Sequence, residues 1–233
     1  MNLVTPESPI TAVIFDMDGL MLDTERMAQL AWQRAGAEHG FTLPDELYLQ
    51  AVGRTATVTE MLFREGFGTD FPFEAVYARK QHYLYSAIDQ EGIPTKAGLF
   101  ELLDLIDQLG LAKAVATSTA RVLATRKLTA AGLLHRFTTI VCGDEVPNGK
   151  PAPDIFLTAA EKLGIAPEQC IVLEDSSAGI KAAHAAGMRA IMVPDLIQPS
   201  AEIRPLTYRI VGNLHHVVSL LTETLTGIDR VVS

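Results

Sequence analysis

Five short apolar runs stand out along the chain and indicate buried strands. Each run is too continuous for a strand with one face in water and too short for a helix. Helical patterns, with apolar residues every three or four positions, lie between the later runs. This alternation predicts an α/β fold, in which a Rossmann-like, mostly parallel sheet carries helices on both faces. The strands are expected at residues 12–15, 112–116, 138–142, 170–174 and 190–193, with a sixth within 207–211, and the helices at 98–110, 121–132, 153–164 and 177–188.

One long segment interrupts the alternation. From about residue 24 to residue 91 the sequence carries helical patterns broken by glycines and has no convincing strand. We therefore predict a helical domain inserted after the first strand, with its two connections to the core near residues 22–25 and 92–97. The expected division is an α/β core of residues 1–23 and 96–233 and a helical domain of residues 24–95.

The first apolar run ends at two aspartates separated by one methionine. Side chains of a strand alternate between its faces, so Asp16 and Asp18 are expected on one side while Met17 packs into the core. Gly19 allows a tight turn and a close approach of the backbone to a ligand. Because open α/β sheets bind ligands beyond the carboxyl ends of their strands, two carboxylates are predicted side by side over one site.

A second acidic pair, Glu174-Asp175, ends the fourth apolar run. Adjacent carboxylates repel each other unless a cation or a proton lies between them. Carboxylate oxygens from Asp16, Asp18 and Asp175 suit Mg²⁺, which prefers carboxylates, water and phosphate oxygens. Magnesium is therefore the expected cofactor, and it would let a phosphate dianion approach Asp16.

Two further segments can bind phosphate. The second strand runs into Thr117-Ser118-Thr119, which offers hydroxyls and backbone N–H groups near the start of a helix. Lys150 lies in the sequence GKPAPD, after a glycine and before a proline-punctuated turn, where its extended side chain can reach the site. As a point charge it would neutralise a phosphoryl oxygen and the nucleophilic carboxylate together.

These groups are the equipment for phosphoryl transfer through a covalent aspartyl phosphate. In this hypothesis Asp16 attacks phosphorus in line. Asp18 protonates the leaving oxygen and then deprotonates the water that hydrolyses the intermediate. The expected substrate is a small phosphorylated metabolite.

Four segments, DMDGLMLDTE, ATST, GKPAPD and EDSSAG, occur in this order along the chain. They resemble the four signature motifs of the haloacid dehalogenase superfamily, and the inserted segment is similar to the α-helical cap of its first subclass. Within the superfamily the chain resembles the β-phosphoglucomutase-like phosphatases, which include sugar-phosphate phosphatases and pseudouridine-5′-phosphatase. The resemblance covers nearly the whole chain and implies a phosphoric monoester hydrolase.

The resemblance implies a role for each acidic residue of the site. Asp16 would be the nucleophile, and Asp18 the acid/base, which would also give the metal its backbone carbonyl rather than its carboxylate. Asp175 would be a metal ligand. Glu174 would be either a ligand or an outer support of the metal site.

The resemblance also implies a phosphate cradle. Ser118 would bind phosphate together with the N–H of Thr119, and Thr117 is the alternative if the register differs by one residue. Lys150 would bind phosphate too. Gly19 is a further candidate for phosphate or substrate binding on its own account, because its backbone can come close to a ligand.

Two residues of the insertion are candidates for substrate contact, because the cap is expected to close over the substrate and exclude water. Arg54 matches a family loop that reaches toward the active site, although arginines are also common in exposed loops. Lys80 occupies a position where family members direct a lysine inward, and a solvated helix face is the competing interpretation.

Departures from the family pattern separate the competing functions. The sugar phosphomutases of this group carry a histidine on the first cap helix, and Ala28 stands at the best-matching position. Hydrolysis is therefore favoured over a phosphomutase, which stays the alternative. Dehalogenases lack the second aspartate, so Asp18 argues against dehalogenation. A phospho-acceptor or binding module without turnover is disfavoured, since receiver domains lack both a second acid two residues on and a large cap.

Charge and composition exclude other classes. The net charge is −9 and the Lys and Arg residues are scattered, whereas a nucleic-acid binder needs a clustered basic face. No apolar run approaches the ~18 residues of a membrane span, and the first residues lack the pattern of a secretory signal. We expect a cytoplasmic protein with no membrane partner and, since no long heptad pattern is present, a monomer.

The two cysteines, Cys142 and Cys170, each lie within an apolar run. The sequence has no CxxC pair and no histidine at zinc spacing near them. Both are therefore expected to be reduced core residues.

Overall fold

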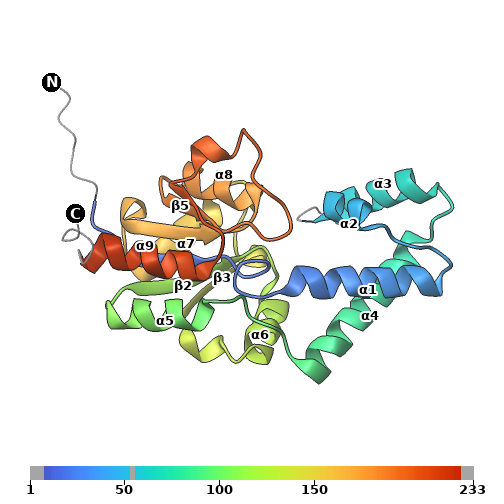
Figure 1. The fold of residues 1–233 in the computed structure, drawn as a ribbon, viewed down its shortest axis with the longest axis horizontal. Coiled ribbons are helices and arrows are strands. Elements are labelled where there is room, and N and C mark those ends of the chain that lie inside the picture. Colours follow the sequence, from blue (N-terminus) through green and yellow to red (C-terminus); the bar gives the residue numbers. More distant parts are fainter. Residues whose placement is uncertain (1–7, 53–55, 227–233) are drawn as a thin grey trace. The chain divides into compact units, whose positions relative to one another are not determined.

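The computed structural model describes residues 8–52 and 56–226. By its contacts the chain divides into two compact units, a core unit of Met1–Met21 and Thr95–Ser233 and a helical unit of Leu22–Pro94. The ribbon of each unit is drawn in Figure 1. The helical domain predicted from the sequence comprises residues 24–95, and the helical unit of the structure is Leu22–Pro94. No helix in the described part of the chain is long and apolar enough to cross a membrane.

The core unit contains a six-stranded sheet in which every pair of neighbouring strands is parallel. The strand order is β3-β2-β1-β4-β5-β6, so the first strand lies in the middle of the sheet. The predicted α/β class with a parallel, Rossmann-like sheet is confirmed. The strands are β1 (Ala12–Phe15), β2 (Ala112–Thr117), β3 (Thr139–Cys142), β4 (Cys170–Glu174), β5 (Arg189–Met192) and β6 (Arg209–Ile210).

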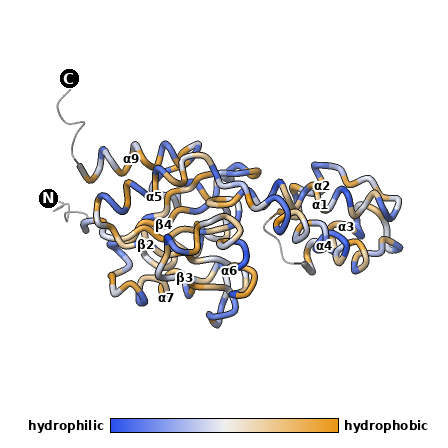
Figure 2. Tube along the Cα trace, turned by 90° about the horizontal axis from the view of Figure 1, so that it is seen from below, coloured by the Kyte–Doolittle hydropathy of each residue, from blue (hydrophilic) through white to orange (hydrophobic). Residues whose placement is uncertain are grey.

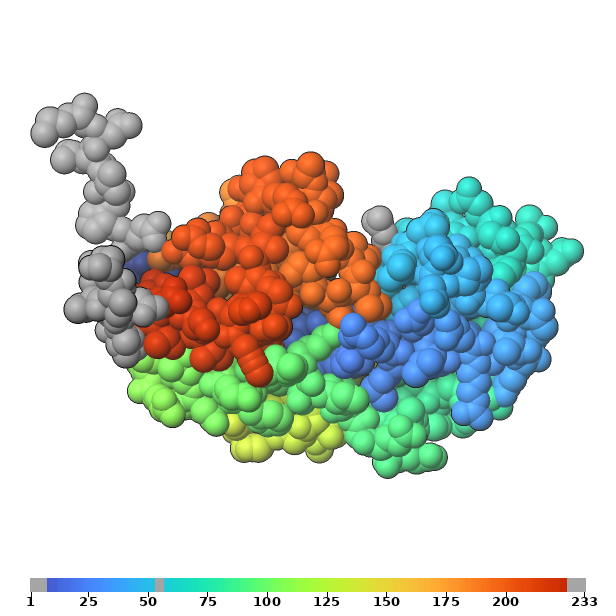
Figure 3. Space-filling model, in the orientation of Figure 1, coloured from blue at the N-terminus to red at the C-terminus, as the bar shows by residue number. Residues whose placement is uncertain are grey.

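Helices cover both faces of this sheet. In Figure 2, α5 and α9 lie on one side of β2 and β4, and α7 lies on the other side. On the outer surface α9 packs against α5 (Figure 3). The helices of the core unit are α5 (Leu99–Gln108), α6 (Arg121–Ala130), α7 (Asp154–Leu163), α8 (Ser177–Ala185) and α9 (Leu214–Thr226), with short 3₁₀ turns at Leu134–Arg136, Gly143–Glu145, Pro167–Gln169 and Arg204–Leu206.

The central strands β1 and β4 are buried because their side chains are largely apolar on both faces. All four residues of β1 and all five of β4 are buried. One face of the sheet packs against Ile155 and Phe156 of α7 and Ile180 of α8. Both cysteines are free and buried, as expected, and burial raises the pKa of each thiol to about 11.

The register of the sheet brings particular residues to its carboxyl edge. Phe15 of β1 is aligned with Val115 of β2 and with Leu173 of β4. Asp16 follows Phe15, and its N–H donates a hydrogen bond to Leu173 O at 3.0 Å. Because β1 lies between β2 and β4, the residues that follow these three strands converge on one place.

The helical unit is held together largely by aromatic rings. Its helices are α1 (Thr24–Glu38), α2 (Asp45–Ala51), α3 (Ala56–Phe67) and α4 (Phe73–Glu91), and α1 packs along α4. Phe63 is fully buried, and its ring centroid lies 4.8 Å from that of Trp32 and 5.9 Å from that of Phe71. Edge-to-face ring pairs of this kind add to the free energy of burial.

Backbone hydrogen bonds join the two chain segments at the boundary between the units. Within the helical unit, Asp23 N donates to Pro94 O at 2.8 Å. Within the core unit, Lys96 N donates to Met21 O at 2.9 Å. The chain therefore leaves the core and returns to it at neighbouring points.

Candidate active site

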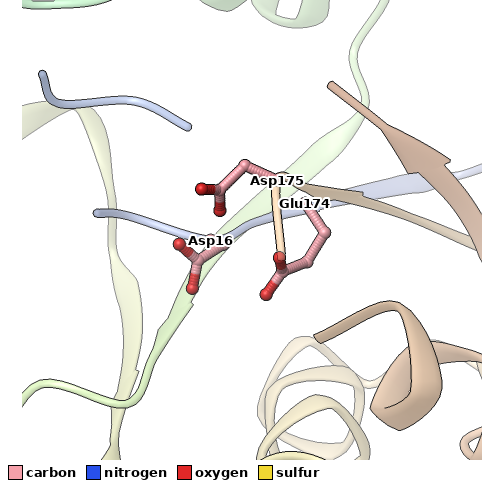
Figure 4. A group of neighbouring side chains, drawn as sticks. All are labelled: Asp16, Glu174 and Asp175. Carbon is pink, nitrogen blue, oxygen red and sulfur yellow. The ribbon is translucent and has the colours of Figure 1, made fainter. Parts of the chain in front are cut away.

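Three carboxylates gather at the carboxyl edge of the sheet. Asp16 follows β1, Glu174 ends β4 and Asp175 follows it (Figure 4). One carboxylate oxygen of each residue lies within 4.8 Å of the others. Close oxygen donors of this kind suit Mg²⁺, which takes carboxylate ligands and retains several waters.

Two glycines make this close approach sterically feasible. Gly19 has a φ of +85°, and a Cβ at this position would lie 2.2 Å from Asp175 Oδ2. A Cβ at Gly179, in the first turn of α8, would lie 1.6 Å from Glu174 Oε1. Any side chain at these two positions would displace a carboxylate of the cluster.

Lys150, which lies in the loop before α7, contacts two of the three carboxylates. Its Nζ lies 2.5 Å from Asp16 Oδ1 and 2.7 Å from Glu174 Oε1. The same nitrogen donates to Ala116 O at 3.2 Å. The side chain of Lys150 is only 5% exposed, so this network is shielded from water.

Burial sets the protonation of this network. It raises the pKa of Asp16 to about 7, while the charge of Lys150 acts in the opposite direction and that of Glu174 in the same direction. Burial also disfavours the charged form of Lys150, but the two carboxylates outweigh it and raise the pKa of the lysine. Lys150 is therefore a permanent cation beside Asp16.

Both oxygens of Glu174 are engaged by protein donors. Oε1 accepts the hydrogen bond from Lys150, and Oε2 accepts from Ser176 N at 2.6 Å and Ser176 Oγ at 2.9 Å. Ser176 in turn caps α8 by accepting from Gly179 N at 3.1 Å. Glu174 is thus tied into the start of this helix, and its side chain has one defined position.

Asp18 faces a different set of donors from those around Asp16. Its Oδ1 lies 2.6 Å from Lys127 Nζ, and its Oδ2 accepts from Thr119 Oγ1 at 2.7 Å. Its carboxylate does not belong to the three-carboxylate cluster found among the described residues. Met17, between the two aspartates, is fully buried, as expected from the sequence, although it lies two residues beyond the end of β1.

Lys127 was not singled out from the sequence, although it carried a signal. It lies on α6, whose buried residues are Ala124, Lys127 and Leu128. A lysine at three- and four-residue spacing from apolar neighbours falls on the face of a helix that packs against the protein. A charged residue on such a face calls for a partner of opposite charge, and here the partner is Asp18.

The end of β2 differs by one residue from the predicted strand end, and this bears on the phosphate cradle. The strand continues to Thr117, whose side chain is buried and whose Oγ1 accepts from Thr119 N at 3.1 Å. Ser118 is exposed. A Cβ at Gly143 would lie 2.3 Å from Ser118 O, so this glycine lets the loop after β2 pass closely.

Of the two candidates for substrate contact in the helical unit, Lys80 lies among the described residues. Arg54 falls outside the described residues. Lys80, on α4, places its Nζ 5.7 Å from the ring centroid of Trp32 and 5.9 Å from that of Tyr77. Ala28, at the position of the phosphomutase histidine, lies on α1.

Comparison with known proteins agrees with this arrangement. The family of haloacid dehalogenase-like hydrolases matches residues 13–193. The chain is similar to the phosphorylated carbohydrates phosphatase of Thermotoga maritima, with 32% identity over 180 residues, 77% of this chain and 83% of the relative. It is also similar to the probable pseudouridine-5′-phosphatase of Drosophila melanogaster, with 36% identity over 192 residues, 80% of this chain and 82% of the relative.

A solved structure shares the fold over nearly the whole length. The crystal structure of a putative β-phosphoglucomutase from Thermotoga maritima matches with a TM-score of 0.79 and 28% identity, over 93% of this chain and 100% of that one. The family match spans more than half of the chain, from β1 to the residue after β5. The chain therefore belongs to the haloacid dehalogenase-like hydrolases.

Proposed function

We propose that this hydrolase is a Mg²⁺-dependent phosphatase that cleaves a small phosphorylated metabolite through an aspartyl-phosphate intermediate. The chain is a phosphoric monoester hydrolase of its family, in which the relatives described above are named phosphatases. The observation that carries the finer proposal is the contact of buried Lys150 with Asp16 and Glu174, beside Asp175 at the edge of the sheet. A nucleophile, a cation and a metal-binding carboxylate then act on one phosphoryl group.

The donor set fits a magnesium ion. Asp16 and Asp175 would hold it with their carboxylates, Asp18 with its backbone carbonyl, and Glu174 would support the site through Lys150 and Ser176. The absence of a side chain at Gly19 leaves room for Asp175 to approach. Bound there, the metal would supply positive charge between the phosphate and the nucleophile, and it would favour the ionised form of Asp16.

In the first step a carboxylate oxygen of Asp16 attacks phosphorus, and the bond between phosphorus and the ester oxygen breaks. Asp18 gives its proton to the departing alcohol oxygen. Lys150 neutralises charge on the phosphoryl oxygens as they pass through the transition state. The products are the free alcohol and a phosphate covalently bound to Asp16.

In the second step water attacks the same phosphorus, and the bond between phosphorus and Asp16 breaks. Asp18, which lost its proton in the first step, now takes one from that water. Inorganic phosphate leaves, and both aspartates return to their initial protonation. The sum of the two steps is hydrolysis of a phosphate monoester.

The phosphate would be held at the loop after β2. We propose that Thr117 takes the hydroxyl role assigned to this motif, because it ends the strand and is buried, whereas the Ser118 side chain is exposed. Ser118 then contributes its backbone N–H. Thr119, whose hydroxyl contacts Asp18, would lie beside the phosphate on the side that carries the rest of the substrate. Gly19 would let the backbone pass close to the phosphate.

Relatives named for carbohydrate and pseudouridine phosphates support a sugar phosphate or nucleoside monophosphate as substrate. The likeness to a putative β-phosphoglucomutase makes phosphoryl transfer between two positions of a sugar the second candidate. Ala28 argues for hydrolysis, because its methyl group cannot act as the second acid/base. Contacts from Arg54 and Lys80 to the substrate belong to the same proposal.

The test is phosphate release from a panel of sugar, polyol and nucleoside phosphates, with wild type and Asp16→Asn measured side by side. Wild type is expected to release phosphate with Mg²⁺ and to lose activity with EDTA. Asp16→Asn, which keeps the shape but removes the nucleophile, is expected to lose on the order of 10³-fold or more in kcat. Mass spectrometry of the wild type quenched in acid should detect a phosphoryl adduct on Asp16.

The contradicting results are distinct. Formation of an isomeric sugar phosphate without net phosphate release would replace the phosphatase by a mutase. Full activity in Asp16→Asn would exclude the aspartyl phosphate. Full activity after EDTA treatment would exclude the metal while leaving the nucleophile in place.

A further inference from the structure

Lys127 forms a part-buried ion pair with the residue proposed as the acid/base, and no role has been given to it so far. Its Nζ lies 2.6 Å from Asp18 Oδ1, and the side chains of Lys127 and Asp18 are 11% and 21% exposed. We propose that Lys127 is a positioning residue that, together with Thr119, fixes the Asp18 carboxylate for proton transfer to the leaving oxygen. The inference rests on the proposed phosphatase activity.

Stability alone does not explain a lysine at this position. Its neighbours on the buried face of α6 are Ala124 and Leu128, and an apolar side chain would fit this environment. Removing two charges from water costs free energy, so a buried ion pair is often no more stable than a well-packed apolar pair. The pair is better explained by what it does to Asp18.

The two donors come from different elements and engage both oxygens of Asp18. Lys127 reaches Oδ1 from α6, and Thr119 reaches Oδ2 from the loop that precedes this helix. A carboxyl group held at both oxygens cannot rotate freely about its last side-chain bond. When Asp18 carries its proton on Oδ2, the Thr119 hydroxyl can accept the hydrogen bond instead of donating it, while Oδ1 still accepts from Lys127. The orientation of Asp18 is therefore fixed before the substrate arrives, which is the geometric requirement for efficient proton transfer.

Each aspartate of the DMD sequence thus has a lysine of its own. Asp16 contacts Lys150, which comes from the loop before α7, and Asp18 contacts Lys127 on α6. The first pair acts on the nucleophile and the phosphoryl group. The second pair acts on the group that handles protons, so losing Lys127 should affect only steps that need a proton.

The leaving group separates these two kinds of effect. Benzyl phosphate releases an alkoxide-like oxygen that needs a proton as the bond to phosphorus breaks. The otherwise similar 4-nitrophenyl phosphate releases a stable phenolate that needs none. Since kcat/KM reports the steps up to the departure of the leaving group, a misplaced Asp18 should lower kcat/KM for benzyl phosphate selectively.

The experiment compares kcat/KM for both substrates in wild type and Lys127→Met, at saturating Mg²⁺ and one pH. We expect a loss of roughly 10- to 100-fold on benzyl phosphate, a part of the usual contribution of general acid catalysis, and less than about 3-fold on 4-nitrophenyl phosphate. The ratio of the two values is taken from one preparation, so the fraction of folded enzyme cancels. Should Lys127→Met not fold, Lys127→Gln is measured in its place with the same expectation.

Three variants calibrate this ratio. Asp18→Asn should show the same selective loss in a stronger form, because the proton donor itself is gone. Lys127→Arg keeps the charge with a different head group. It should bring the ratio of the two kcat/KM values part of the way back to that of wild type. Lys181→Met removes a lysine paired with Glu202 at the surface of the core unit and should leave the ratio unchanged.

The outcomes decide between the proposals. A selective loss on benzyl phosphate in Lys127→Met, shared by Asp18→Asn, supports the positioning role. An equal loss on both substrates, or no loss on either, overturns it while the phosphatase proposal stands. Folded wild type without activity on these two substrates and on every sugar, polyol and nucleoside phosphate of the panel overturns the proposed function and this inference with it.

Discussion

The two units of the chain bury different kinds of side chain. Among the described residues, charged side chains with little exposure include Asp16, Lys127, Lys150 and Glu174, and all four lie in the core unit. In the described part of the helical unit no charged side chain is buried, and rings such as Trp32 and Phe63 fill its interior. Buried charges need exact partners and add little to stability, whereas rings stabilise through area and shape. The buried charges of the core unit are thus best explained by the proposed reaction, and the buried rings of the helical unit by packing.

The charges of the helical unit follow the same division. Its pair of Glu38 and Arg79, with two hydrogen bonds of 2.6 and 3.2 Å, lies at the surface, and Arg79 also lies over the ring of Tyr83. Water screens such pairs, so they contribute little to folding. If the comparison is right, the same kind of substitution should have very different consequences in the two units.

The largest effect is expected for Lys150→Met in the core unit. The change leaves Asp16 and Glu174 buried side by side without their common cation. We expect activity to fall on the order of 10³-fold and the free energy of unfolding to fall by about 3 to 5 kcal/mol. Urea denaturation and phosphate release measure the two quantities.

The matched control is Arg79→Met in the helical unit. It removes a cation from an exposed pair, and the unfolding midpoint is expected to stay close to that of wild type. Similar destabilisation by both substitutions would show that burial of the charges does not distinguish the units.

The second effect is expected for Phe63→Ala, which tests the role of the rings. Phe63 is fully buried among Trp32, Phe67, Phe71 and Phe73. Removing its ring should destabilise the helical unit by about 3 to 5 kcal/mol. Hydrogen exchange followed by mass spectrometry should show faster exchange in α1, α3 and α4.

Phe100→Ala serves as the control for ring removal. This phenylalanine lies on α5 of the core unit and is 45% exposed, so little packing is lost. We expect exchange rates close to wild type throughout. Faster exchange in the core strands of Phe63→Ala would mean that the two units do not respond separately.

The smallest effect is expected from alkaline pH, and it concerns the core unit alone, where both thiols lie. Burial raises the pKa of Cys142 and of Cys170 to about 11. The unfolded chain loses these protons near pH 8.5 while the folded chain keeps them, so stability falls as the pH rises from about 8.5 to 11. The expected loss is roughly 1 to 2 kcal/mol per thiol by pH 10.

Denaturation curves at pH 8 and pH 10 measure this effect, with Cys142→Ala/Cys170→Ala as the reference. The double variant should lose less stability than wild type between the two pH values. Equal losses in both proteins would show that the thiols ionise in the folded state as readily as in the unfolded chain.

The sheet could be predicted from the sequence because its strands are buried on both faces. A strand such as β4, Cys170–Glu174, is a continuous apolar run that stops at an acid, and both its bounds follow from that pattern. The extent of β2 was missed by one residue, since Thr117 is polar and its burial is decided by neighbouring strands. This difference of one residue decides whether the hydroxyl next to the site belongs to Thr117 or to Ser118.

The sequence predicts those residues of the candidate site that lie in short local motifs, and it does not predict the others. Asp16, Lys150 and Asp175 lie in short segments whose chemistry is apparent from their neighbours. Lys127 lies 109 residues from Asp18 along the chain, and only the packing of α6 brings them together. The substrate could not be predicted, since no motif of the helical unit indicates a substrate class.

The paired segments at the boundary between the units have a consequence for how this chain could change. Asp23 N binds Pro94 O, and Lys96 N binds Met21 O, so the exit and the return of the polypeptide lie next to each other. Because the inserted segment begins and ends at one place, its length and sequence can change without a change in the strand order of the sheet. Remodelling this insertion would leave Asp16, Lys150, Glu174 and Asp175 unchanged, because all four belong to the core unit.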